Sequence, residues 1–381
     1  MSRVKFGDVV KDVKINIDRL NNPYEYYVAG DHMDSEDLTI HRKGCFTTDD
    51  VGPAFIRVFK PGQILYGSRR TYLKKIAVAD FEGVCANTTF VFETKDPHAF
   101  EQRLLPFIML SKDFTTWSIA KSKGSTNPYV LFSDLADFEF ELPPLEEQKV
   151  LVDKLWAAYR LKEAYKKLLV ATDEMVKSQF IEMFENVESY CKLEDLVSDT
   201  FPGEWGSEPI SENAIKVIRT TNFTNEGYLD LTDVVTRDIE PKKVVRKKLK
   251  QGDTILERSG GTKDNPVGRV VFFDEIGDYL PNNFTQVLRP KESVNPVYLF
   301  YALYNSYNLN KAAMRAMASQ TTGIQNLSMS DFMAKFIVLP SRNEQNKFEQ
   351  IYRQADKSKS VIQKALVYLN DIQSDELGKI A

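Results

Sequence analysis

Residues 133–148 read SDLADFEFELPPLEEQ, and residues 330–345 read SDFMAKFIVLPSRNEQ. Each stretch leads into a long helical pattern, and the matched positions lie 197 residues apart. The identical pairs are Ser133 with Ser330, Asp134 with Asp331, Leu142 with Leu339, Pro143 with Pro340, Glu147 with Glu344 and Gln148 with Gln345. A repeat with so long a period is not a solenoid of small units. It predicts two similar globular domains with an approximate twofold axis, which suits a ligand with two similar halves, such as duplex DNA.

The repeat extends upstream of these joints. Residues 60–68 (KPGQILYGS) correspond to 250–258 (KQGDTILER), and Asn87, Thr89 and Val91 correspond to Asn283, Thr285 and Val287. A glycine before a short apolar run is typical of a turn that opens a strand. Each half therefore predicts a mixed α and β domain. We expect strands at 64–66, 75–79, 89–92, 254–256, 269–273 and 286–288, and helical stretches at about 99–110 and 296–317.

Two long helices are expected at about 145–185 and 342–377. Apolar residues follow one another at alternating steps of three and four, which is the pattern of a coiled-coil seam. The seam is predicted to contain Ala158, Leu161, Tyr165, Leu168 and Met175 in the first helix, and Phe348, Ile351, Ile362, Ala365, Leu369 and Ile372 in the second. Each seam needs a partner, so an antiparallel pairing of the two helices is favoured. The alternative is that each helix packs only on its own domain.

Composition limits the class of protein. The three cysteines, Cys45, Cys85 and Cys191, are far apart and form no CxxC pair, so neither a disulfide framework nor a zinc site is indicated. The three histidines are too scattered for metal-ligand spacing, and no metal is expected. The N-terminus has no signal-peptide apolar core, and the longest apolar stretch, residues 104–110, is too short to span a bilayer. We therefore expect a cytoplasmic protein without a membrane partner.

A formal net charge of −4 is unusual for a free-standing DNA-binding protein, but phosphate contacts are made by one face, so local charge matters more. Basic clusters lie in the globular halves, whereas the helices carry much of the acid. Loops at the edge of a rigid domain supply the donors and guanidinium groups that read base edges. The candidate DNA-binding residues are Ser68, Arg69, Arg70, Tyr72, Lys74, Lys121, Lys123, Ser125, Thr126 and Asn127 in the first half, and Arg258, Ser259, Lys263, Gln320, Thr321, Thr322, Gln325 and Asn326 in the second.

Three fragments resemble catalytic motifs, and none is supported. Asn127-Pro128-Tyr129 lacks one proline of the amino-methyltransferase loop, and no glycine-rich cofactor loop precedes it. Asp80 with Glu93-Thr94-Lys95 has nuclease-like spacing, but the second copy has Arg289 in place of Glu93. Residues 260–263 (GGTK) have the wrong spacing for a phosphate-binding loop. No catalytic residue is therefore predicted.

The doubled LPPLEEQ and LPSRNEQ joints, each leading into a long helix, resemble the specificity subunit of type I restriction–modification systems. The 62–68 and 252–258 blocks resemble its target-recognition domains, and the likeness covers essentially the whole chain. It implies a non-catalytic subunit in which each domain reads one half of a split DNA sequence and the helices act as a ruler. The implied partners are double-stranded DNA, two methyltransferase subunits that bind S-adenosylmethionine, and two translocating nuclease subunits that use ATP and magnesium. The chain itself would hold no cofactor.

The expected fold is α+β, with two similar mixed α/β domains separated by two long antiparallel coiled-coil helices and a pseudo-twofold internal repeat. The expected division is 1–144 and 187–340 for the domains, and 145–186 and 341–381 for the helices. Two alternatives remain open: a specificity chain for a fused methyltransferase–nuclease, and a coiled-coil scaffold that does not bind DNA. A self-contained methyltransferase would require a cofactor motif that the sequence does not show.

Overall fold

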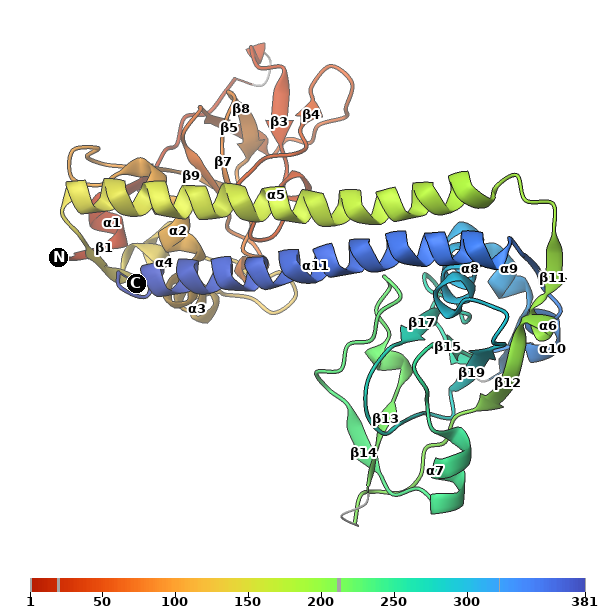
Figure 1. The fold of residues 1–381 in the computed structure, drawn as a ribbon. Coiled ribbons are helices and arrows are strands. Elements are labelled where there is room, and N and C mark those ends of the chain that lie inside the picture. The colour runs from red at the N-terminus through yellow and green to blue at the C-terminus, as the bar shows by residue number, and fades with distance from the viewer. Residues whose placement is uncertain (1, 19–20, 211–213, 322, 381) are drawn as a thin grey trace. The chain divides into compact units, whose positions relative to one another are not determined.

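The computed structural model describes residues 2–18, 21–210, 214–321 and 323–380 (Figure 1). The chain forms two compact units. The first contains Met1–Lys167 with Ile362–Ala381, and the second contains Leu168–Val361. Each unit therefore holds one globular region and a portion of both long helices, α5 (Leu145–Phe184) and α11 (Arg342–Leu377). No helix among the described residues is both long enough and apolar enough to cross a membrane.

The globular region of the first unit is built on two four-stranded sheets. One has the order β2-β9-β6-β7, and the other has the order β4-β3-β8-β5. The strands of the first sheet are β2 (Val10–Asp12), β9 (Thr89–Thr94), β6 (Ile64–Gly67) and β7 (Ile76–Val78). Those of the second are β4 (Gly44–Cys45), β3 (Tyr26–Val28), β8 (Gly83–Ala86) and β5 (Phe55–Phe59). Strands β3 and β8 are parallel, whereas the other neighbours are antiparallel.

The second unit repeats this topology, except that its described residues include no counterpart of β5. Its four-stranded sheet has the order β12-β19-β15-β17, and a three-stranded sheet has the order β14-β13-β18 with β13 and β18 parallel. These strands are β12 (Val197–Pro202), β19 (Thr285–Pro290), β15 (Asp253–Glu257), β17 (Val270–Phe273), β14 (Val235–Arg237), β13 (Ile215–Ile218) and β18 (Tyr279–Pro281). Equivalent strands take equivalent places in both units, which confirms the predicted repeat. The six predicted strands are also confirmed, as β6, β7, β9, β15, β17 and β19.

A glycine precedes each of the equivalent strands β6 and β15, because the backbone there adopts a conformation that favours glycine. Gly62 and Gly252 both have positive φ values, 84° and 93°, which favour glycine because a Cβ atom would be strained there. Each also donates its N–H across the turn, to the carbonyl of Ala79 or Phe273 at 2.8 Å. The glycine-led turns inferred from the sequence are therefore present in both copies.

Helices cover the sheets and complete the cores. In the first unit these are α1 (Phe6–Val9), α2 (Leu105–Leu110), α3 (Lys112–Ala120) and α4 (Phe132–Ala136); in the second they are α6 (Leu193–Leu196), α7 (Pro241–Lys247), α8 (Pro296–Leu309), α9 (Lys311–Ala316) and α10 (Met329–Met333). The stretch expected to be helical at 99–110 is helical only from η4 (Gln102–Leu104) through α2, and the one at 296–317 is divided into α8 and α9. Pro296 stands in the first turn of α8, where its missing N–H costs little.

The repeated joint sequence has the same structure in both units. Strand β10 (Glu139–Leu142) pairs with β1 (Ser2–Lys5), and β22 (Phe336–Val338) pairs with β11 (Tyr190–Lys192). The prolines that follow the strands, Pro143 and Pro340, cannot continue the ladder, and α5 and α11 begin shortly afterwards. The Ser-Asp stretch itself forms the short helices α4 and α10.

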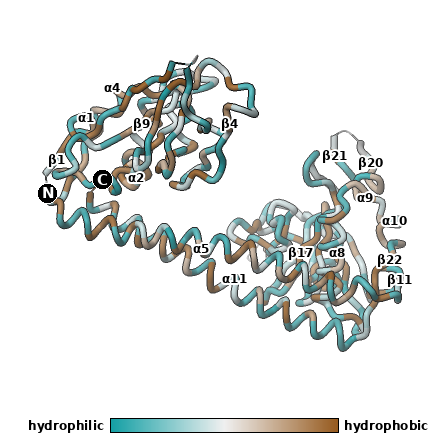
Figure 2. The backbone as a smooth tube through the Cα atoms, turned by 90° about the horizontal axis from the view of Figure 1, so that it is seen from above, coloured by the Kyte–Doolittle hydropathy of each residue, from teal (hydrophilic) through white to brown (hydrophobic). Residues whose placement is uncertain are grey.

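Both long helices pack against the globular region of each unit. Val152, Leu155 and Tyr159 of α5 lie in the core of the first unit with Leu377 of α11. In the second unit the core includes Val176, Phe180 and Phe184 of α5, and Phe348, Tyr352 and Ala355 of α11. Figure 2 shows hydrophobic and hydrophilic residues alternating along both helices, as expected for helices that are buried along one side.

The two helices also contact each other within each unit, and they do so in antiparallel directions. Lys162 donates to the Gln373 side chain at 3.1 Å in the first unit, and Lys359 contacts Asp173 at 2.6 Å in the second. The helices therefore combine the two alternatives considered from the sequence, since each packs on a globular region and on the other helix.

The residues predicted for the α11 seam lie on the inward side of the helix. Phe348, Ile362 and Leu369 are buried, and Ile351, Ala365 and Ile372 are half-buried.

The seam predicted for α5 is partly wrong. Ala158 is buried and Tyr165 is half-buried, but Leu161, Leu168 and Met175 are 42%, 48% and 44% exposed. The inward positions lie one residue later, at Lys162, Leu169 and Val176. Residues 168–171 (LLVA) and the Met175-Val176 pair are apolar at adjacent positions, so either phase fits the pattern. The phase is fixed by Val176, Phe180 and Phe184, which enter the core of the second unit at intervals of four residues.

Candidate nucleic-acid interface

In the first unit, the two loops selected from the sequence lie side by side. The backbone of Arg70 donates to Pro128 at 2.7 Å, and Val130 donates to Ser68 at 2.9 Å. Arg69 also forms a β-bridge with Tyr129, which in turn pairs with Lys123 through two backbone hydrogen bonds of 2.8 and 2.9 Å. The loop that follows β6 and the loop that precedes α4 therefore form one continuous surface.

The loop after β6 has an unusual backbone on both sides of the short helix η3 (Thr71–Leu73). Arg70 has φ 51° and ψ 54°, and Lys74 has φ 47° and ψ 45°, so both are left-handed non-glycine residues. Such residues cost on the order of 1–2 kcal/mol, and strained residues of this kind cluster at functional sites. The surrounding hydrogen bonds, including Leu73 N–H to Arg70 and Lys74 N–H to Thr71, hold this conformation.

The cations on this surface differ in how they are engaged. Arg69 and Arg70 are exposed, as is Tyr72. Lys121 lies over the Trp117 ring, with its ammonium 4.7 Å from the ring centroid. Lys123 contacts both carboxylate oxygens of Asp134, at 2.9 and 3.1 Å. The hydrogen bond from Lys123 lowers the pKa of Asp134 below its ordinary value, so this carboxylate is charged at neutral pH.

Two predicted residues of the first surface are held by other groups. Ser68 is buried, and its hydroxyl donates to the Thr88 carbonyl at 2.5 Å. Lys74 is partly covered and pairs with Glu36 at 2.5 Å. By contrast, Ser125, Thr126 and Asn127 are exposed at the turn of the second loop. We therefore omit Ser68 from the surface that we consider for DNA.

The second unit brings its two predicted loops together as a small sheet. Strand β16 (Ser259–Gly260) pairs with β21 (Ile324–Leu327), which pairs with β20 (Ala318–Thr321). Ser259 lies opposite Asn326, and its buried hydroxyl donates to the Asn326 side chain at 2.7 Å. The arrangement matches the first unit, since the loop after the glycine-led strand again pairs with the loop before the Ser-Asp joint. Thr322 lies outside the described residues, and only the backbone of Gln320 and Thr321 is described.

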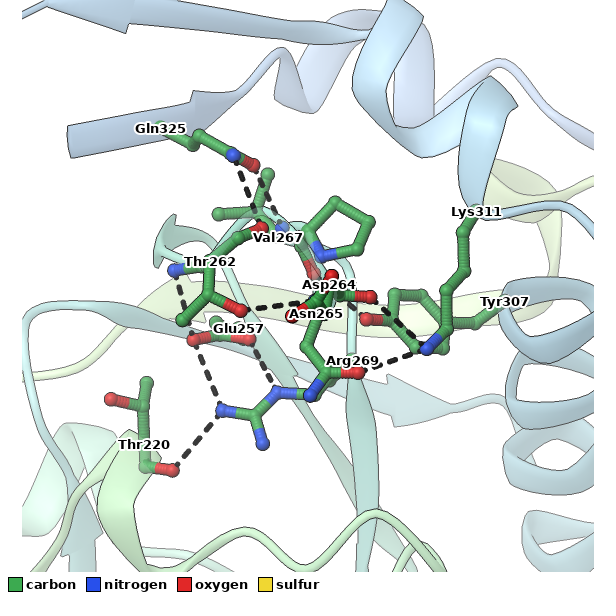
Figure 3. Close-up of polar contacts among 12 residues, drawn as sticks. Thr220, Glu257, Thr262, Asp264, Asn265, Val267, Arg269, Tyr307, Lys311 and Gln325 are labelled. Atoms are coloured by element: carbon green, nitrogen blue, oxygen red, sulfur yellow. Dashed lines mark hydrogen bonds and ion pairs between the residues drawn. The ribbon is translucent and has the colours of Figure 1, made fainter. Parts of the chain in front are cut away.

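The loop that carries Lys263 is held in place mainly through its backbone (Figure 3). The Gln325 amide bridges it, donating to Thr262 at 3.4 Å and accepting from Val267 at 3.3 Å. Lys311 donates to the Asn265 side chain at 2.9 Å, and Tyr307 donates to the Pro266 carbonyl at 2.9 Å. The loop is thereby fixed before any ligand binds, which lowers the entropy cost of recognition.

A buried ion pair supports this loop from below. Arg269 makes two contacts with Glu257, at 2.7 and 3.2 Å, and Glu257 is 2% exposed. The Glu257 carboxylate also accepts a hydrogen bond from the backbone N–H of Gly261 at 3.3 Å. Burial opposes the charge on Arg269, but the Glu257 carboxylate outweighs it and raises the pKa of the guanidinium. Glu257 lies in a repeat that the sequence did reveal, but its pairing with Arg269 was not predicted.

On the second surface the Lys263 side chain is exposed and the Arg258 side chain is half-buried. Gln325 and Asn326 are also half-buried and take part in the loop contacts described above. Sequence reasoning missed Arg315, an exposed residue of α9 whose guanidinium donates to the Lys263 carbonyl at 2.8 Å. Its position one helical turn after Lys311, on the helix that leads into the second loop, could have suggested it. Tyr129, 40% exposed between the paired loops of the first unit, was also missed.

Histidine and carboxylates meet at one place that the sequence did not reveal. In the first unit His41, Asp37 and Glu163 bring one possible ligand atom each within 4.8 Å of one another. Their oxygens already have partners: Asp37 accepts from Tyr159 at 2.6 Å and lies 2.9 Å from His41, and Glu163 pairs with Lys166 at 2.7 Å. These contacts account for the cluster without an ion, so we assign no metal to it.

Comparison with known proteins shows the family. The model of the type I restriction modification DNA specificity domain matches the chain twice, at residues 19–169 and 200–366. A curated relative is the type I restriction enzyme EcoDI specificity subunit of Escherichia coli, 28% identical over 142 residues. That match covers 36% of this chain and only 31% of the relative.

Two solved structures share the fold along nearly the whole chain. One is the type I restriction–modification S subunit from M. genitalium, with a TM-score of 0.63 and 14% identity, covering 99% of this chain and 94% of that one. The other comes from a study of complex assembly and conformational transition in a type I R-M system, with a TM-score of 0.56 and 19% identity, covering 99% and 96%. At such low identity these matches speak for the fold alone. The double match of the family model, which spans most of the sequence in the two copies of the repeat, shows that the chain belongs to the family of type I restriction modification DNA specificity domains.

Proposed function

We propose that this chain is the DNA target-recognition subunit of a type I restriction–modification complex, in which each unit reads one half of a bipartite sequence. One observation carries the proposal. In both units the loop after the glycine-led strand is hydrogen-bonded to the loop before the Ser-Asp joint, and together they present arginine, lysine and amide groups. Family membership supports the same reading.

The chemistry of these surfaces suits base-edge recognition. Guanidinium groups such as those of Arg69 and Arg70 can donate two hydrogen bonds to guanine in the major groove, while Asn127 offers both a donor and an acceptor for adenine. Lysines such as Lys121 and Lys263 suit phosphates, which position a protein without reading sequence. With a net charge of −4 for the whole chain, this local charge must act together with contacts from other subunits.

We further propose which subunits form the complex with this chain and what each of them does. Two methyltransferase subunits would bind S-adenosylmethionine, and two translocating nuclease subunits would use ATP and magnesium. The exposed sides of α5 and α11 would dock the methyltransferase subunits, and the length of the helices would set the spacing between the half-sites. The chain itself would be catalytically silent and would act in the cytoplasm.

A methylation experiment tests the recognition role. The chain would be co-expressed with its methyltransferase subunit in a host without DNA methylation, and the modified motif would be read by sequencing. We expect a split motif, one half of which changes or relaxes when Arg69 and Arg70 are both replaced by Ala. Each lost bidentate contact should weaken discrimination by about 1–3 kcal/mol. Equal loss at both halves in a folded variant would contradict independent reading by the two units.

The same experiment distinguishes the alternatives. Methylation by the rigorously purified chain alone would contradict a non-catalytic role. Complex formation without any DNA binding would favour a coiled-coil scaffold. Co-purification with a single polypeptide that both methylates and cleaves would favour the fused methyltransferase–nuclease variant.

A further inference from the structure

A cavity of about 230 Å³ opens in the second unit, where α8 and the loop that follows η5 (Thr220–Asn222) meet α5 and α11. Its lining residues all belong to this unit. They do not include the loop residues considered for DNA. The cavity therefore requires an explanation separate from the proposed recognition surfaces.

Aromatic rings make up the walls of the cavity. Phe300, Tyr301 and Tyr304 come from α8, Tyr352 comes from α11, and Tyr228 comes from the loop after η5. The centroids of neighbouring rings lie close together, at 5.6 Å for Tyr301 with Tyr304 and 5.9 Å for Tyr301 with Tyr352. The Tyr228 ring presents its face to a cation, since the Lys359 ammonium lies 4.5 Å from its centroid, and aromatic rings attract cations in this geometry.

The loop that carries Tyr228 is pressed closely onto these rings. Gly227 has φ +85°, and a Cβ atom at this position would lie 2.8 Å from Phe300 and 3.0 Å from Tyr304. A residue without a side chain is therefore needed for the loop to approach the aromatic wall. This close packing holds the Tyr228 loop against the α8 rings that line the cavity.

Four carboxylates also line the cavity. Asp173 and Glu174 come from α5, Glu226 from the loop and Asp356 from α11, against two ammonium groups, Lys177 and Lys359. The carboxylates make the surroundings negative: after burial, which is the main cause, the charges of Asp173 and Glu174 help to raise the pKa of Tyr301. The cavity thus combines an aromatic wall with a net negative charge.

Lys359 shows that the cavity can hold a primary ammonium group. This lysine is 8% exposed, and its ammonium lies 4.5 Å from the centroid of the Tyr228 ring and 2.6 Å from Asp173. A buried lysine requires such compensation, because removing an ammonium group from water is costly. One side of the cavity is therefore already a site for a primary ammonium group, while Glu174 and Glu226 remain exposed on its rim.

The first unit contains the equivalent cavity with different chemistry. Lys162 lies 197 positions before Lys359, Glu36 lies 190 positions before Glu226, and both line a cavity of about 620 Å³. Tyr159 is the only aromatic residue in the lining of this cavity, and three further lysines, Lys74, Lys112 and Lys166, take part. The repeat thus provides a matched position, Glu36, in surroundings that lack both the aromatic wall and the excess of carboxylates.

We propose that the aromatic cavity of the second unit binds a small aliphatic ammonium ion, with the chemistry of a linear diamine. One ammonium group would lie against the aromatic wall beside Lys359, and the carboxylates of Glu226 and Asp356 would compensate its charge. An aliphatic chain of a few carbons fits a cavity of this size and would contact the ring faces. This site is independent of the proposed DNA surfaces.

Calorimetric titration of the full-length chain with 1,4-diaminobutane tests the proposal, with 1,4-butanediol as the uncharged control. We expect the diamine to bind and the diol not to bind. Glu226→Gln and Asp356→Asn should each weaken binding about tenfold, the effect of losing one compensating charge. Glu36→Gln, the matched change in the first unit, should leave the affinity unchanged. Equal binding of diamine and diol, or equal effects of the Glu226 and Glu36 variants, would overturn the proposal.

Removal of the Lys359 ammonium group should have the opposite effect on the affinity for the diamine. Lys359→Met keeps an unbranched side chain, one atom shorter and without charge, and frees Asp173 and the Tyr228 ring. Diamine should therefore bind about tenfold more tightly, once circular dichroism has shown the variant to be folded. Unchanged or weaker binding in the folded variant would contradict the proposed position of the ligand. The ammonium group could belong to a free amine or to a lysine side chain of another protein, and a parallel titration with Nα-acetyl-lysine methylamide distinguishes the two. Tighter binding of this compound would indicate a lysine side chain. Tighter binding of the diamine would indicate a free amine.

Discussion

Gln148 and Gln345, 197 residues apart, make the same two kinds of hydrogen bond in the two units. The amide of Gln148 donates to Pro143 at 2.7 Å and accepts from the backbone of Glu101 at 2.8 Å. The amide of Gln345 donates to Pro340 at 2.8 Å and accepts from the backbone of Asn295 at 2.8 Å. Each buried side chain thereby joins the end of a strand, the start of a long helix and the segment that leads into the helices covering the sheet.

Replacement of either glutamine by leucine should destabilise its unit. The apolar side chain would leave a backbone N–H and a carbonyl without their partners, at about 1–3 kcal/mol for each buried group. Urea unfolding would measure the loss, and Glu147→Gln, an exposed neighbour, should change stability by less than about 0.5 kcal/mol. If Gln148→Leu behaved like Glu147→Gln, the glutamine would not be the structural joint inferred here.

Arg70 offers a way to separate recognition from folding. Because its backbone is left-handed, Arg70→Gly should stabilise the chain relative to Arg70→Ala by about 1 kcal/mol. Both variants should weaken recognition of the same half-site, since both lose the guanidinium group. Thermal unfolding and a methylation assay on defined duplexes would measure the two effects. If the more stable variant, Arg70→Gly, also recognised the half-site better than Arg70→Ala, Arg70 would act through the fold and not through a contact with DNA.

Lys263→Ala should weaken DNA binding with little effect on the fold. The contact that Arg315 makes is to the carbonyl of Lys263, so truncation of the side chain leaves it intact. A phosphate contact predicts a similar loss on all sequences and a salt dependence whose slope falls by about 1. Binding of the assembled complex across a salt series would measure this, with Lys291→Ala, an exposed residue just after β19, as the control. A change confined to one base position would instead assign Lys263 to base reading.

The Lys123–Asp134 pair predicts a pH dependence. Because the folded state lowers the pKa of Asp134, the contribution of this carboxylate to stability is present above the ordinary value of 3.8 and is lost as the pH falls through the lower folded pKa. The pair is partly exposed, so the contribution should stay below about 1 kcal/mol. Asp134→Asn should be the less stable protein at pH 7, and urea unfolding of the two proteins should converge toward pH 3. A constant difference at all pH values would show that the charge of Asp134 is not the cause.

The proposed ruler predicts a change of spacing. Four residues inserted in α5 within 166–170, together with four in α11 within 362–366, would preserve the Lys162–Gln373 and Lys359–Asp173 contacts of the two units. The insertion adds about 6 Å of helix, close to two base pairs at about 3.4 Å each. Four residues are absorbed by a heptad pattern as a stutter. A methylation assay over a series of spacers should show the same half-sequences with a longer spacer, whereas an unchanged optimum would exclude helix length as the determinant.

Much of the fold could be predicted because two parts of the sequence encode the same structure, so that a pattern found in one could be checked in the other. Matching glycines, strand patterns and joints identified the equivalent sheets and both long helices. The phase of the α5 seam could not be predicted, since Met175 and Val176 are apolar neighbours and the choice between them depends on how Phe180 and Phe184 enter a core formed by distant residues.

The paired loops were predictable as segments but not as individual side chains. Ser68 and Ser259 have the composition of surface residues, yet each donates its hydroxyl to a partner far along the chain, Thr88 or Asn326. The Glu257–Arg269 pair and the guanidinium of Arg315 depend on the same long-range pairing. Short-range sequence patterns identify where a loop lies. The hydrogen-bond partner of each polar atom depends on the tertiary structure.

Two residues far apart in the chain, Ser2 and Ile380, both lie at strand β10. Ser2 lies opposite Leu142 in the ladder with β1, and the carbonyl of Ile380 accepts from the backbone of Glu141 at 2.8 Å. A short linker could therefore join residues 2 and 380, and the chain could be opened in the connector at 185–189 that follows α5. Such a circular permutant would keep the pairing of every strand and both long helices. The fold is in this sense separable from the order of its two halves along the chain, since residues 2 and 380 lie at one strand.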